Sequence, residues 1–397
     1  MKNPLSLLII ITILTRLFCI YIFKATEISN EWGVMVSIIE KNHIIGFREI
    51  DGEVMPSVFM PPLYPIFLYL IKIFFNNLDY YLLTIQFIQL LFSIVSTVYI
   101  IKILSEFFST KVTYIGGYIF SLFPLNIYAV SQISSITMQI FLTTIYFYTF
   151  LQLLKSNSKK NIILLSLSSA LLILLRGEFF IFYIYSLIFF IFEKKIKIFI
   201  LIFSITTLLI SPYLIRNYGI FETVTITKSS GFNLFKGNNP TSNVEGSPML
   251  NLDDINKLSK ETYEKAIKIK KQPKYDLMID NLYKEEALNF IKNDPVRYIK
   301  LYIAKLFSFI FLDLNSTYPN YYNFFHIVPK ILISISTLMG IFFLINKRNL
   351  LNFFSLYYLL NALIFSIFFI LPRYSLALLP VQIILSCAFI DKINKRI

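Results

Sequence analysis

Apolar blocks close to twenty residues long recur along most of this chain, and they constrain its fold more than any other feature. A helix needs about 20 apolar residues to cross the hydrocarbon core of a bilayer. Hydrophobic residues make up 56% of the 397 positions and charged residues only 15%, against about 25% charged in soluble domains. The sequence therefore predicts an all-α integral membrane protein that crosses the bilayer many times.

Two shorter apolar pieces, Leu63–Phe75 and Tyr298–Leu312, decide the predicted topology. If both lie along the membrane interface, every short basic cluster falls on the same side as the N-terminus, as the positive-inside rule requires. This arrangement predicts ten spans with both termini in the cytoplasm. The predicted spans are Leu5–Phe23, Tyr80–Ser105, Val112–Val130, Ile136–Leu154, Asn161–Leu175, Phe179–Phe192, Ile196–Ile215, Ile327–Ile345, Leu350–Leu371 and Ser375–Ile390.

This topology divides the chain into three parts. An N-terminal membrane bundle, 1–215, contains a first outer loop at 24–79; a large outer loop with an interfacial helix covers 216–326; C-terminal membrane helices fill 327–397. The large loop opens with strand-like sequence, FETVTITKSSGFNLFKGNNP, rich in β-branched residues and turn formers. Helices are expected from Asp253 or Asp254 to Lys271 and again from Asp280, with Pro295 ending the second.

The formal net charge of +14 does not indicate nucleic acid, because lysines and arginines punctuate the apolar blocks and do not cluster on one soluble domain. Cys19 and Cys387 both lie in apolar runs, and we interpret them as small apolar side chains. No small-residue cleavage site follows Met1–Phe23, so this segment is expected to be an uncleaved first span.

The first outer loop carries the candidate catalytic residue. In a basic chain, Thr26–Pro65 is locally acidic, with six carboxylates against one lysine and one arginine. Glu31 stands just beyond the first span and next to Trp32, the single tryptophan, a ring typical of headgroup depth. A partly desolvated carboxylate at this level suits a general base, although an exposed loop glutamate is the simpler interpretation.

Three arginines fall at the outer boundary, where topology alone does not place positive charge: Arg176, Arg216 and Arg373. Arg16 lies inside the first span. Guanidinium groups at headgroup level suit bidentate recognition of a phosphate. The alternative for each is snorkelling toward lipid headgroups or structural pairing, for example of Arg176 with Glu178.

Other site signals are weak. His43 and His326 are the only histidines and stand in different loops without a metal-ligand spacing, so no metal is expected. The sequence contains no GxGxxG, phosphate-binding P-loop or nucleophile elbow. No cofactor is therefore predicted.

Several stretches together resemble bacterial membrane glycosyltransferases of the protein mannosyltransferase and aminoarabinose transferase type. EWGVMVSIIEKNHIIGF followed by PSVFMPPLYP is similar to their first outer loop. SPYLIRNYGIF with GFNLFKGNNP is similar to the start of their large loop, and PRYSLALLPV to an Arg-Tyr motif that opens a late span. The resemblance implies a GT-C fold whose outer loops bind a polyprenyl-phosphate sugar and transfer the sugar with inversion to an envelope acceptor.

The resemblance also implies residue roles. Glu31 matches the catalytic acid of the first loop, where the family more often has aspartate, and Gln139 stands where a second acid is usual. Arg216 and Arg373 are the preferred phosphate ligands, with Arg176 a weaker candidate. Tyr64, Tyr374 and Asn238 are expected to border the substrate pocket, and the expected location is a bacterial cytoplasmic membrane with the site on its outer side.

Two other functions remain open from the sequence. A lipid-linked sugar transporter or flippase would also use many spans and outer arginines, but it should carry ionisable groups or broken helices at the midplane. A polysaccharide polymerase or ligase would place its essential residues in the second loop and would not need Glu31. The sequence leaves the oligomeric state, the sugar and the acceptor undetermined.

Overall fold

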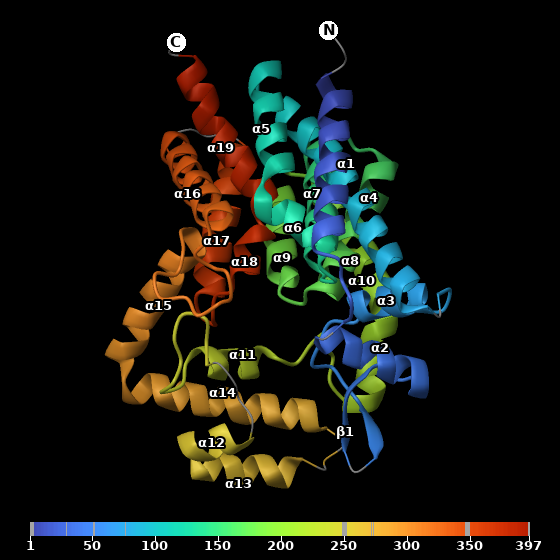
Figure 1. Cartoon of the computed structure of the whole chain (residues 1–397), viewed down its shortest axis with the longest axis vertical. Helices are drawn as coiled ribbons and strands as arrows, with labels where there is room; N and C mark the ends of the chain where they lie inside the picture. The colour runs from blue at the N-terminus through green and yellow to red at the C-terminus, as the bar shows by residue number, and fades with distance from the viewer. Residues whose placement is uncertain are drawn as a thin grey trace.

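The computed structural model of this chain describes residues 4–28, 30–50, 52–75, 77–247, 252–270, 272, 274–345 and 350–395. It consists of a long helical body with a smaller layer at one end, and both termini lie at the other end (Figure 1). Of the residues named above, Met1 and Lys271 fall outside the described residues.

The structure confirms an all-α membrane protein with several apolar helices. Five helices are long and apolar enough to cross a bilayer, while the predicted count of ten stays a prediction. The exterior of the body carries large apolar side chains such as Phe18 and Leu208, which are 67% and 70% exposed, as expected for a surface that faces lipid. The five helices are α1 (Pro4–Ile22), α4 (Leu78–Ser105), α7 (Ile136–Lys155), α10 (Ile196–Phe221) and α16 (Phe324–Leu344).

Shorter helices complete the body. One expected span, Val112–Val130, is wrong as a single helix, because Pro124 starts a new helix after the extended Phe123. Proline has no N–H to continue the hydrogen-bond ladder. The shorter helices are α5 (Thr110–Leu122), α6 (Pro124–Ser131), α8 (Lys159–Leu175), α9 (Phe179–Phe192), α17 (Leu351–Phe365), α18 (Pro372–Leu376) and α19 (Leu379–Asn394).

The buried Arg16 compensates for the break at Pro124. Its guanidinium donates to the carbonyl of Ser121, near the end of α5, and its Nε donates to Ser93 Oγ at 3.1 Å. Carbonyls at a helix end lack donors of their own, and lipid cannot supply them. Arg16 therefore has a structural explanation.

The sequence interpretation of the late spans was also too simple. Leu350–Leu371 is not one helix: α17 ends at Phe365, and the chain then runs without helix to Pro372, the first residue of α18. Proline suits a first helical turn, where its missing N–H would have no partner. The five-residue α18 places Arg373 and Tyr374 near the end of the body that is opposite to the termini.

Two segments far apart in sequence form the layer at the end of the body (Figure 1). The first contains α2 (Glu31–Asn42), the antiparallel strands β1 (Gly46–Ile50) and β2 (Glu53–Pro56), and α3 (Leu63–Lys72). The second contains α11 (Ser230–Gly237), α12 (Leu252–Leu258), α13 (Lys260–Ile269), α14 (Tyr275–Asn293) and α15 (Pro295–Ile310). These segments correspond to the two predicted outer loops, although their sidedness relative to a membrane stays a prediction.

Some expectations for the second segment are wrong. The strand-like stretch after Phe221 forms no strand among the described residues; it is a loop followed by α11. The helix expected through Lys271 is divided at Ser259, which caps α13 by accepting from the Thr262 N–H, and α14 begins before Asp280. Pro295 does end α14 and start α15, as predicted.

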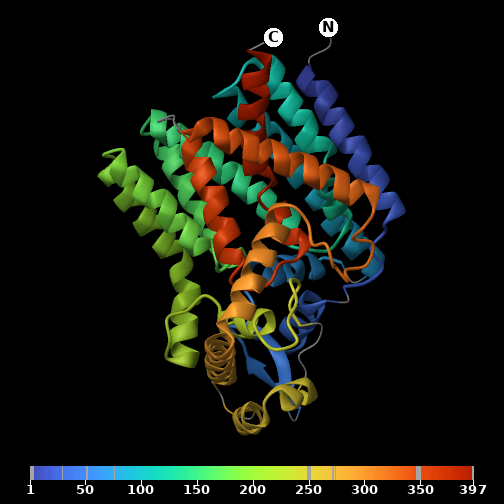
Figure 2. The same cartoon turned by 90° about the vertical axis from the view of Figure 1, so that its left-hand side faces the viewer.

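α10 connects the body to this layer. It runs through Arg216 to Phe221 and projects beyond the body as a continuous helix (Figure 2). Arg216 therefore lies inside a helix and not after one. Its position places it beside the first segment, not beside α18.

Candidate functional site

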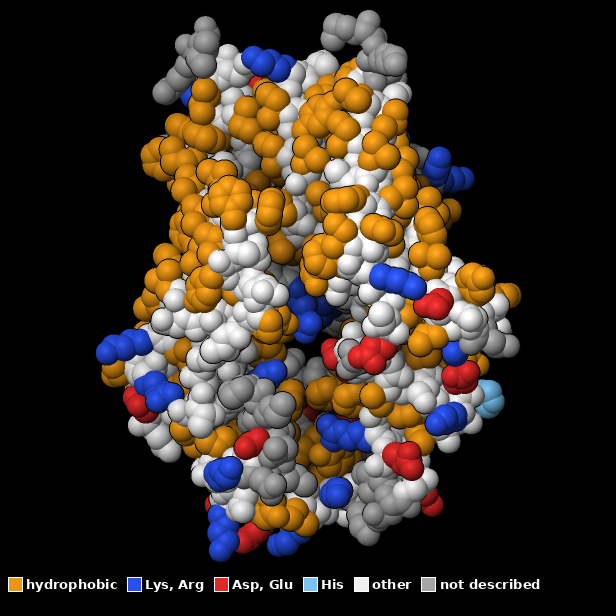
Figure 3. All heavy atoms as spheres, in the orientation of Figure 1, with side chains coloured by type: hydrophobic (Ala, Val, Ile, Leu, Met, Phe, Trp, Pro, Cys, Tyr) orange, Lys and Arg blue, Asp and Glu red, His pale blue; other side chains and the backbone are white. Residues whose placement is uncertain are grey.

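A pocket lies where the helical body meets the outer layer. About 480 Å³ of space, including its open mouth, is free of protein atoms there. On the face seen in Figure 3, basic and acidic side chains gather around a hollow at this level, below the apolar surface of the body. The walls come from the start of α7, the α8–α9 turn, α17 and α18, through Ile136, Gln139, Thr143, Arg176, Glu178, Phe179, Phe182, Tyr357, Asn361, Phe365, Arg373, Tyr374, Ala377 and Leu378.

Arg176 reaches the pocket because α8 ends there. Arg176 is the C-cap, its backbone extended with φ −146° and ψ 99°, and the turn through Gly177 leads into α9. A Cβ at Gly177 would stand 2.7 Å from Thr227 Oγ1, so glycine allows the outer loop to cover this turn closely. The Nε of Arg176 is buried and has no hydrogen-bond partner among the described residues.

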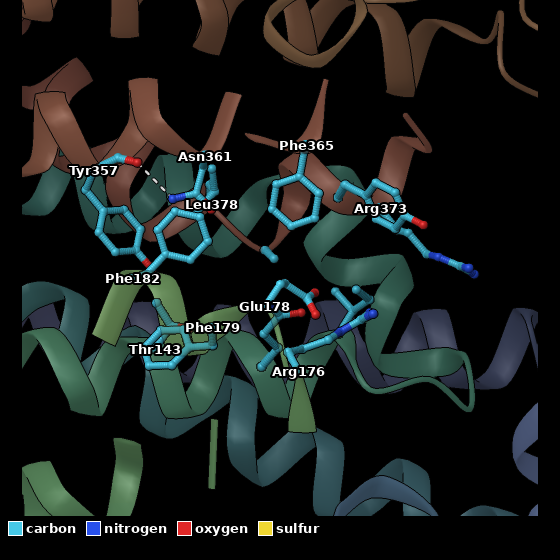
Figure 4. Close-up of a pocket in the computed structure, with 14 residues that line it drawn as sticks. Thr143, Arg176, Glu178, Phe179, Phe182, Tyr357, Asn361, Phe365, Arg373 and Leu378 are labelled. Carbon is cyan, nitrogen blue, oxygen red and sulfur yellow. Dashed lines mark hydrogen bonds between the residues drawn. The ribbon is translucent and has the colours of Figure 1, made fainter. Parts of the chain in front are cut away.

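Arg373 comes from α18, on the opposite wall. Figure 4 shows the side chains of Arg176 and Arg373 extending in the same direction, away from Tyr357 and Asn361. Neither arginine forms an ion pair with a described carboxylate, and the predicted pairing of Arg176 with Glu178 is absent from the described ion pairs. The structure thus brings two guanidinium groups without a described ion-pair partner to one pocket.

Tyr374 lies between these charges. Its ring centroid is 6.0 Å from the guanidinium carbon of Arg373. Burial raises the pKa of Tyr374, while Arg373 and Arg176 lower it and Glu178 raises it. All three charged groups therefore act on one phenol, which is consistent with a compact site.

The pocket is polar at its mouth and apolar below. Gln139, Glu178 and the two arginines supply polar groups, whereas Phe182, Phe365 and other rings supply the floor. Lipid-like molecules have the same division between a charged head and an apolar stem.

Glu31 is the first helical residue of α2 and does not itself line the pocket. It is partly exposed and makes no hydrogen bond or ion pair with a described residue. The position of Glu31 relative to the pocket is indicated by Lys236 of α11. Burial and then Arg373 lower the pKa of Lys236, and Glu31 raises it. Glu31 and Arg373 thus both lie close enough to Lys236 to affect its charge.

Sequence reasoning missed Lys236. Its ammonium nitrogen lies 4.8 Å from the centroid of the Phe369 ring, in the segment that leads to α18. The available signal was its place in GFNLFKGNNP, directly before Gly237. A Cβ at Gly237 would stand 1.9 Å from the carbonyl oxygen of Phe368, so this glycine permits α11 to approach that segment.

Asn30 fixes the start of α2. Its Oδ1 accepts from the Trp32 N–H at 3.1 Å, as an N-cap does, and its Nδ2 donates to the Ile133 carbonyl at 3.3 Å. Ile133 precedes α7, the helix that carries Gln139 into the pocket. Asn30 therefore links the helix of Glu31 to one wall of the pocket.

Tyr64 packs against Trp32 in α2, the helix that Glu31 begins. It is buried, packs edge-on against Trp32 with centroids 5.3 Å apart, and its hydroxyl lies 3.4 Å from Gln89 Oε1. Gln89 in turn donates to the carbonyls of Val130 and Gln132. Tyr64 does not line the pocket, and its contacts explain it as packing.

Arg216 and Asn238 do not line the pocket either. Arg216 donates to the carbonyls of Ser57 and Ile45, at 3.1 and 3.0 Å, and to Asn217 Oδ1 at 2.7 Å. Asn238 is buried; its Nδ2 donates to the Ile367 carbonyl, and its Oδ1 accepts from Lys305 Nζ at 3.0 Å. Both have structural explanations, so the geometry favours Arg176 over Arg216 as a phosphate ligand.

Metal ligands are sparse in this region. Within the described ranges, no group of three or more histidine, cysteine, aspartate or glutamate side chains could hold a metal ion. Where the resemblance leads one to expect a second acid, Gln139 contributes an amide to the pocket.

Comparison with known proteins gives a fold but no sequence family. No family model matches the chain, and no curated protein matches it. Among solved structures, it is similar to the oligosaccharyltransferase of Archaeoglobus fulgidus, crystallised with a tethered acceptor peptide that contains the NVT sequon. The TM-score is 0.57 at 12% identity, and the match covers 100% of this chain but 50% of that one.

This similarity shows the architecture. The chain spans about half the length of the archaeal enzyme, and at this identity the likeness concerns the fold alone. The GT-C type of membrane fold, expected from the sequence, is therefore supported at the level of overall architecture. The narrower resemblance to mannosyl- and aminoarabinosyltransferases stays a prediction.

Proposed function

We propose that this chain is an inverting membrane glycosyltransferase, which moves a sugar from a polyprenyl-phosphate donor to an acceptor at the outer face of a bacterial cytoplasmic membrane. The observation that carries the proposal is the pair Arg176 and Arg373 at one pocket with aromatic side chains in its walls, where the buried Nε of Arg176 has no hydrogen-bond partner among the described residues. A buried N–H without a partner costs about 1–3 kcal/mol. A ligand with oxygen acceptors would remove this cost.

The phosphate of a lipid-linked sugar suits this pair. Its negative oxygens would accept from the two guanidinium groups, and Lys236 adds a third positive charge nearby. The first isoprene units would occupy the apolar floor near Phe182 and Phe365. The archaeal neighbour, named as an oligosaccharyltransferase, gives this proposal fold-level support.

The chemistry needs one base. The acceptor hydroxyl oxygen attacks the anomeric carbon, Glu31 takes the hydroxyl proton, and the bond from that carbon to the phosphate oxygen breaks with its electrons left on the phosphate. Arg176 and Arg373 stabilise the charge that develops there. A single displacement inverts the anomeric centre, and a phosphate leaving group needs no general acid.

A transporter is less well supported by the geometry. Arg16, buried in α1, donates to Ser93 Oγ and to the Ser121 carbonyl, which gives these donors a structural role, while its Nη2 has no hydrogen-bond partner among the described residues. A polymerase or ligase would rely on the second segment, where Lys236 is the candidate. Neither alternative needs Glu31, which acts with Arg373 on the pKa of Lys236 and has no ion-pair partner among the described residues.

Reconstitution tests the proposal. Purified full-length protein in liposomes receives labelled polyprenyl-phosphate sugars and extracted envelope material as acceptor, and transfer is measured. Native transfer that depends on both substrates is the expected result. Donor binding or movement across the bilayer without transfer would instead support a transporter and contradict the proposal.

A further inference from the structure

Lys305 is a fully buried lysine that the proposed mechanism does not use. It belongs to α15, which rises from the layer at the end of the body toward the body itself (Figure 1), and its side chain is 0% exposed. Its ammonium group has no carboxylate partner among the described ion pairs. Because lysine is almost never fully buried without such a partner, this position needs an explanation.

The ammonium group of Lys305 binds the C-terminal end of α11. It donates to the Gly237 carbonyl at 2.7 Å and to Asn238 Oδ1 at 3.0 Å. The last carbonyls of a helix lack donors of their own and carry partial negative charge, so a cation is stabilised there. Gly237 directly follows Lys236, the third positive charge beside the pocket. Lys305 therefore fixes the backbone next to Lys236.

The same end of α11 contacts the segment that leads to Arg373. Asn238 Nδ2 donates to the Ile367 carbonyl at 2.9 Å, and Lys236 Nζ lies 4.8 Å from the centroid of the Phe369 ring. This segment runs between α17 and α18 without forming a helix. Its position therefore depends on contacts with α11, and Lys305 holds the residues that make them.

We infer that Lys305 is a positioning residue of the phosphate site, which holds the end of α11 against the segment before Arg373 so that Lys236 and Arg373 face one ligand. Lys305 does not touch that ligand itself. The inference rests on the proposed function for the identity of the ligand, a lipid phosphate. The contacts of Lys305 with α11 do not depend on that identity.

The charge of Lys305 should change near neutral pH. Burial lowers its pKa to about 7. The neighbouring elements supply Lys236 on α11, Glu245 in the loop after it and Arg373 on α18, none of which pairs with Lys305 in the described ion pairs, and α17 has no charged residue. A charged donor forms hydrogen bonds about twice as strong as a neutral one. The bonds from Lys305 to α11 should therefore weaken as the pH rises through this value.

Substitutions at two lysines of α15 test this role. Lys305→Met keeps the length of the side chain and removes every donor. Lys305→Gln keeps an N–H donor without charge, and it takes the place of the methionine variant if that variant does not fold. Lys300→Met is the matched control, because Lys300 is exposed on the same helix and forms no described ion pair. Thermal unfolding shows whether each variant is folded.

The first measurement is the affinity of the full chain in nanodiscs for farnesyl phosphate. Lys305→Met should weaken binding about three- to tenfold, whereas Lys300→Met should bind as the native protein does. Because Lys305 acts partly through Lys236, the double variant with Lys236→Met should lose less than the product of the two single losses. Native affinity in a folded Lys305 variant, or losses that multiply fully in the double variant, would overturn the inference.

A pH profile separates positioning from simple stabilisation of the fold. The probe is farnesyl-phosphate glucose, because its phosphodiester keeps one negative charge across neutral pH, whereas a phosphate monoester titrates at about pH 6. The affinity of the native protein should fall as the pH rises through about 7, and Lys305→Met should not show this transition. A transition of equal size in both proteins would contradict the inference.

A third measurement needs no ligand. The rate at which Lys236 reacts with an amine-reactive reagent, followed by mass spectrometry, reports how firmly the end of α11 is held. Lys236 should react several-fold faster in Lys305→Met than in the native protein or in Lys300→Met, and equal rates would overturn the inference. If the native protein does not bind farnesyl phosphate, the proposed function fails, and this rate still decides whether Lys305 positions Lys236.

Discussion

Two charged regions lie near the boundary between the helical body and the layer at its end, and their charges have different partners. In the first region, the junction, the charged side chains bind other protein groups. Arg216 donates to the carbonyls of Ile45 and Ser57 and to the side-chain amide oxygen of Asn217. Asp276 Oδ2 accepts from Ser57 Oγ and the Val58 N–H at 2.5 and 2.9 Å. At the pocket, neither Arg176 nor Arg373 has a carboxylate partner among the described ion pairs, and Glu31, outside the pocket, has none either. The difference separates charges that hold the two segments of the layer together from charges that we propose bind a lipid phosphate.

Glu31→Gln should give the largest effect. Removing a general base lowers the rate about 10²- to 10⁴-fold, while donor binding and thermal stability stay near native because Glu31 has no internal partner. Transfer rates and donor titration in liposomes measure this. Glu27→Gln, an exposed carboxylate on the same loop, is the control and should keep full activity.

The arginine pair should come next. Arg176→Gln or Arg373→Gln is expected to reduce transfer about 10²- to 10³-fold by removing a donor to the departing phosphate. Lysine at either position should restore part of the rate, since it keeps charge but not bidentate geometry. Steady-state kinetics measure the transfer rate. Near-native transfer in both glutamine variants would contradict the assignment of Arg176 and Arg373 to the phosphate.

Arg216→Met tests the other side of the comparison. It leaves the carbonyls of Ser57 and Ile45 without their donor, so we expect a loss of about 1–3 kcal/mol in stability. Thermal unfolding in detergent measures it, and Asp276→Asn should destabilise in the same manner. Activity per folded molecule should remain within a few-fold of native, and a stable but inactive Arg216→Met would assign Arg216 to the phosphate instead.

The smallest effect concerns pH and Lys236. Burial and Arg373 lower the pKa of Lys236, so it loses its charge at a lower pH than an ordinary lysine, whose pKa is about 10.4. Affinity for a lipid phosphate should therefore weaken as pH rises through this lowered value. Titrations across alkaline pH should show the transition in native protein and not in Lys236→Met.

Much of the body could be predicted from sequence, because apolar length directly reports a helix in lipid. Breaks within the helices were harder to predict. Pro124 is a helix breaker in the sequence, but the apolar run continues across it and favoured one uninterrupted span. The β1–β2 hairpin was missed, although Gly52 with φ +85° marks its turn. The β-branched residues 223–227 form a loop and not a strand, while Ser230–Gly237, which contains none, forms α11 and contacts Asp280 of α14.

The candidate site could be predicted only in part. Boundary position identified Arg176, Arg216 and Arg373 as one group; Arg176 and Arg373 do line one pocket, together with Tyr374, which was expected to border it. It could not separate Arg216 from them, because its partners are carbonyls of residues more than 150 positions away. Backbone acceptors carry no sequence signal, so only coordinates reveal that this arginine is already satisfied.

Binding of farnesyl phosphate to purified protein tests the central claim most directly. The Arg176→Gln, Arg373→Gln double variant should lose at least 100-fold in affinity, about 2.8 kcal/mol, while Glu31→Gln and a folded Arg216→Met bind as the native protein does. Native-like affinity in the double variant would contradict a lipid-phosphate site at this pocket.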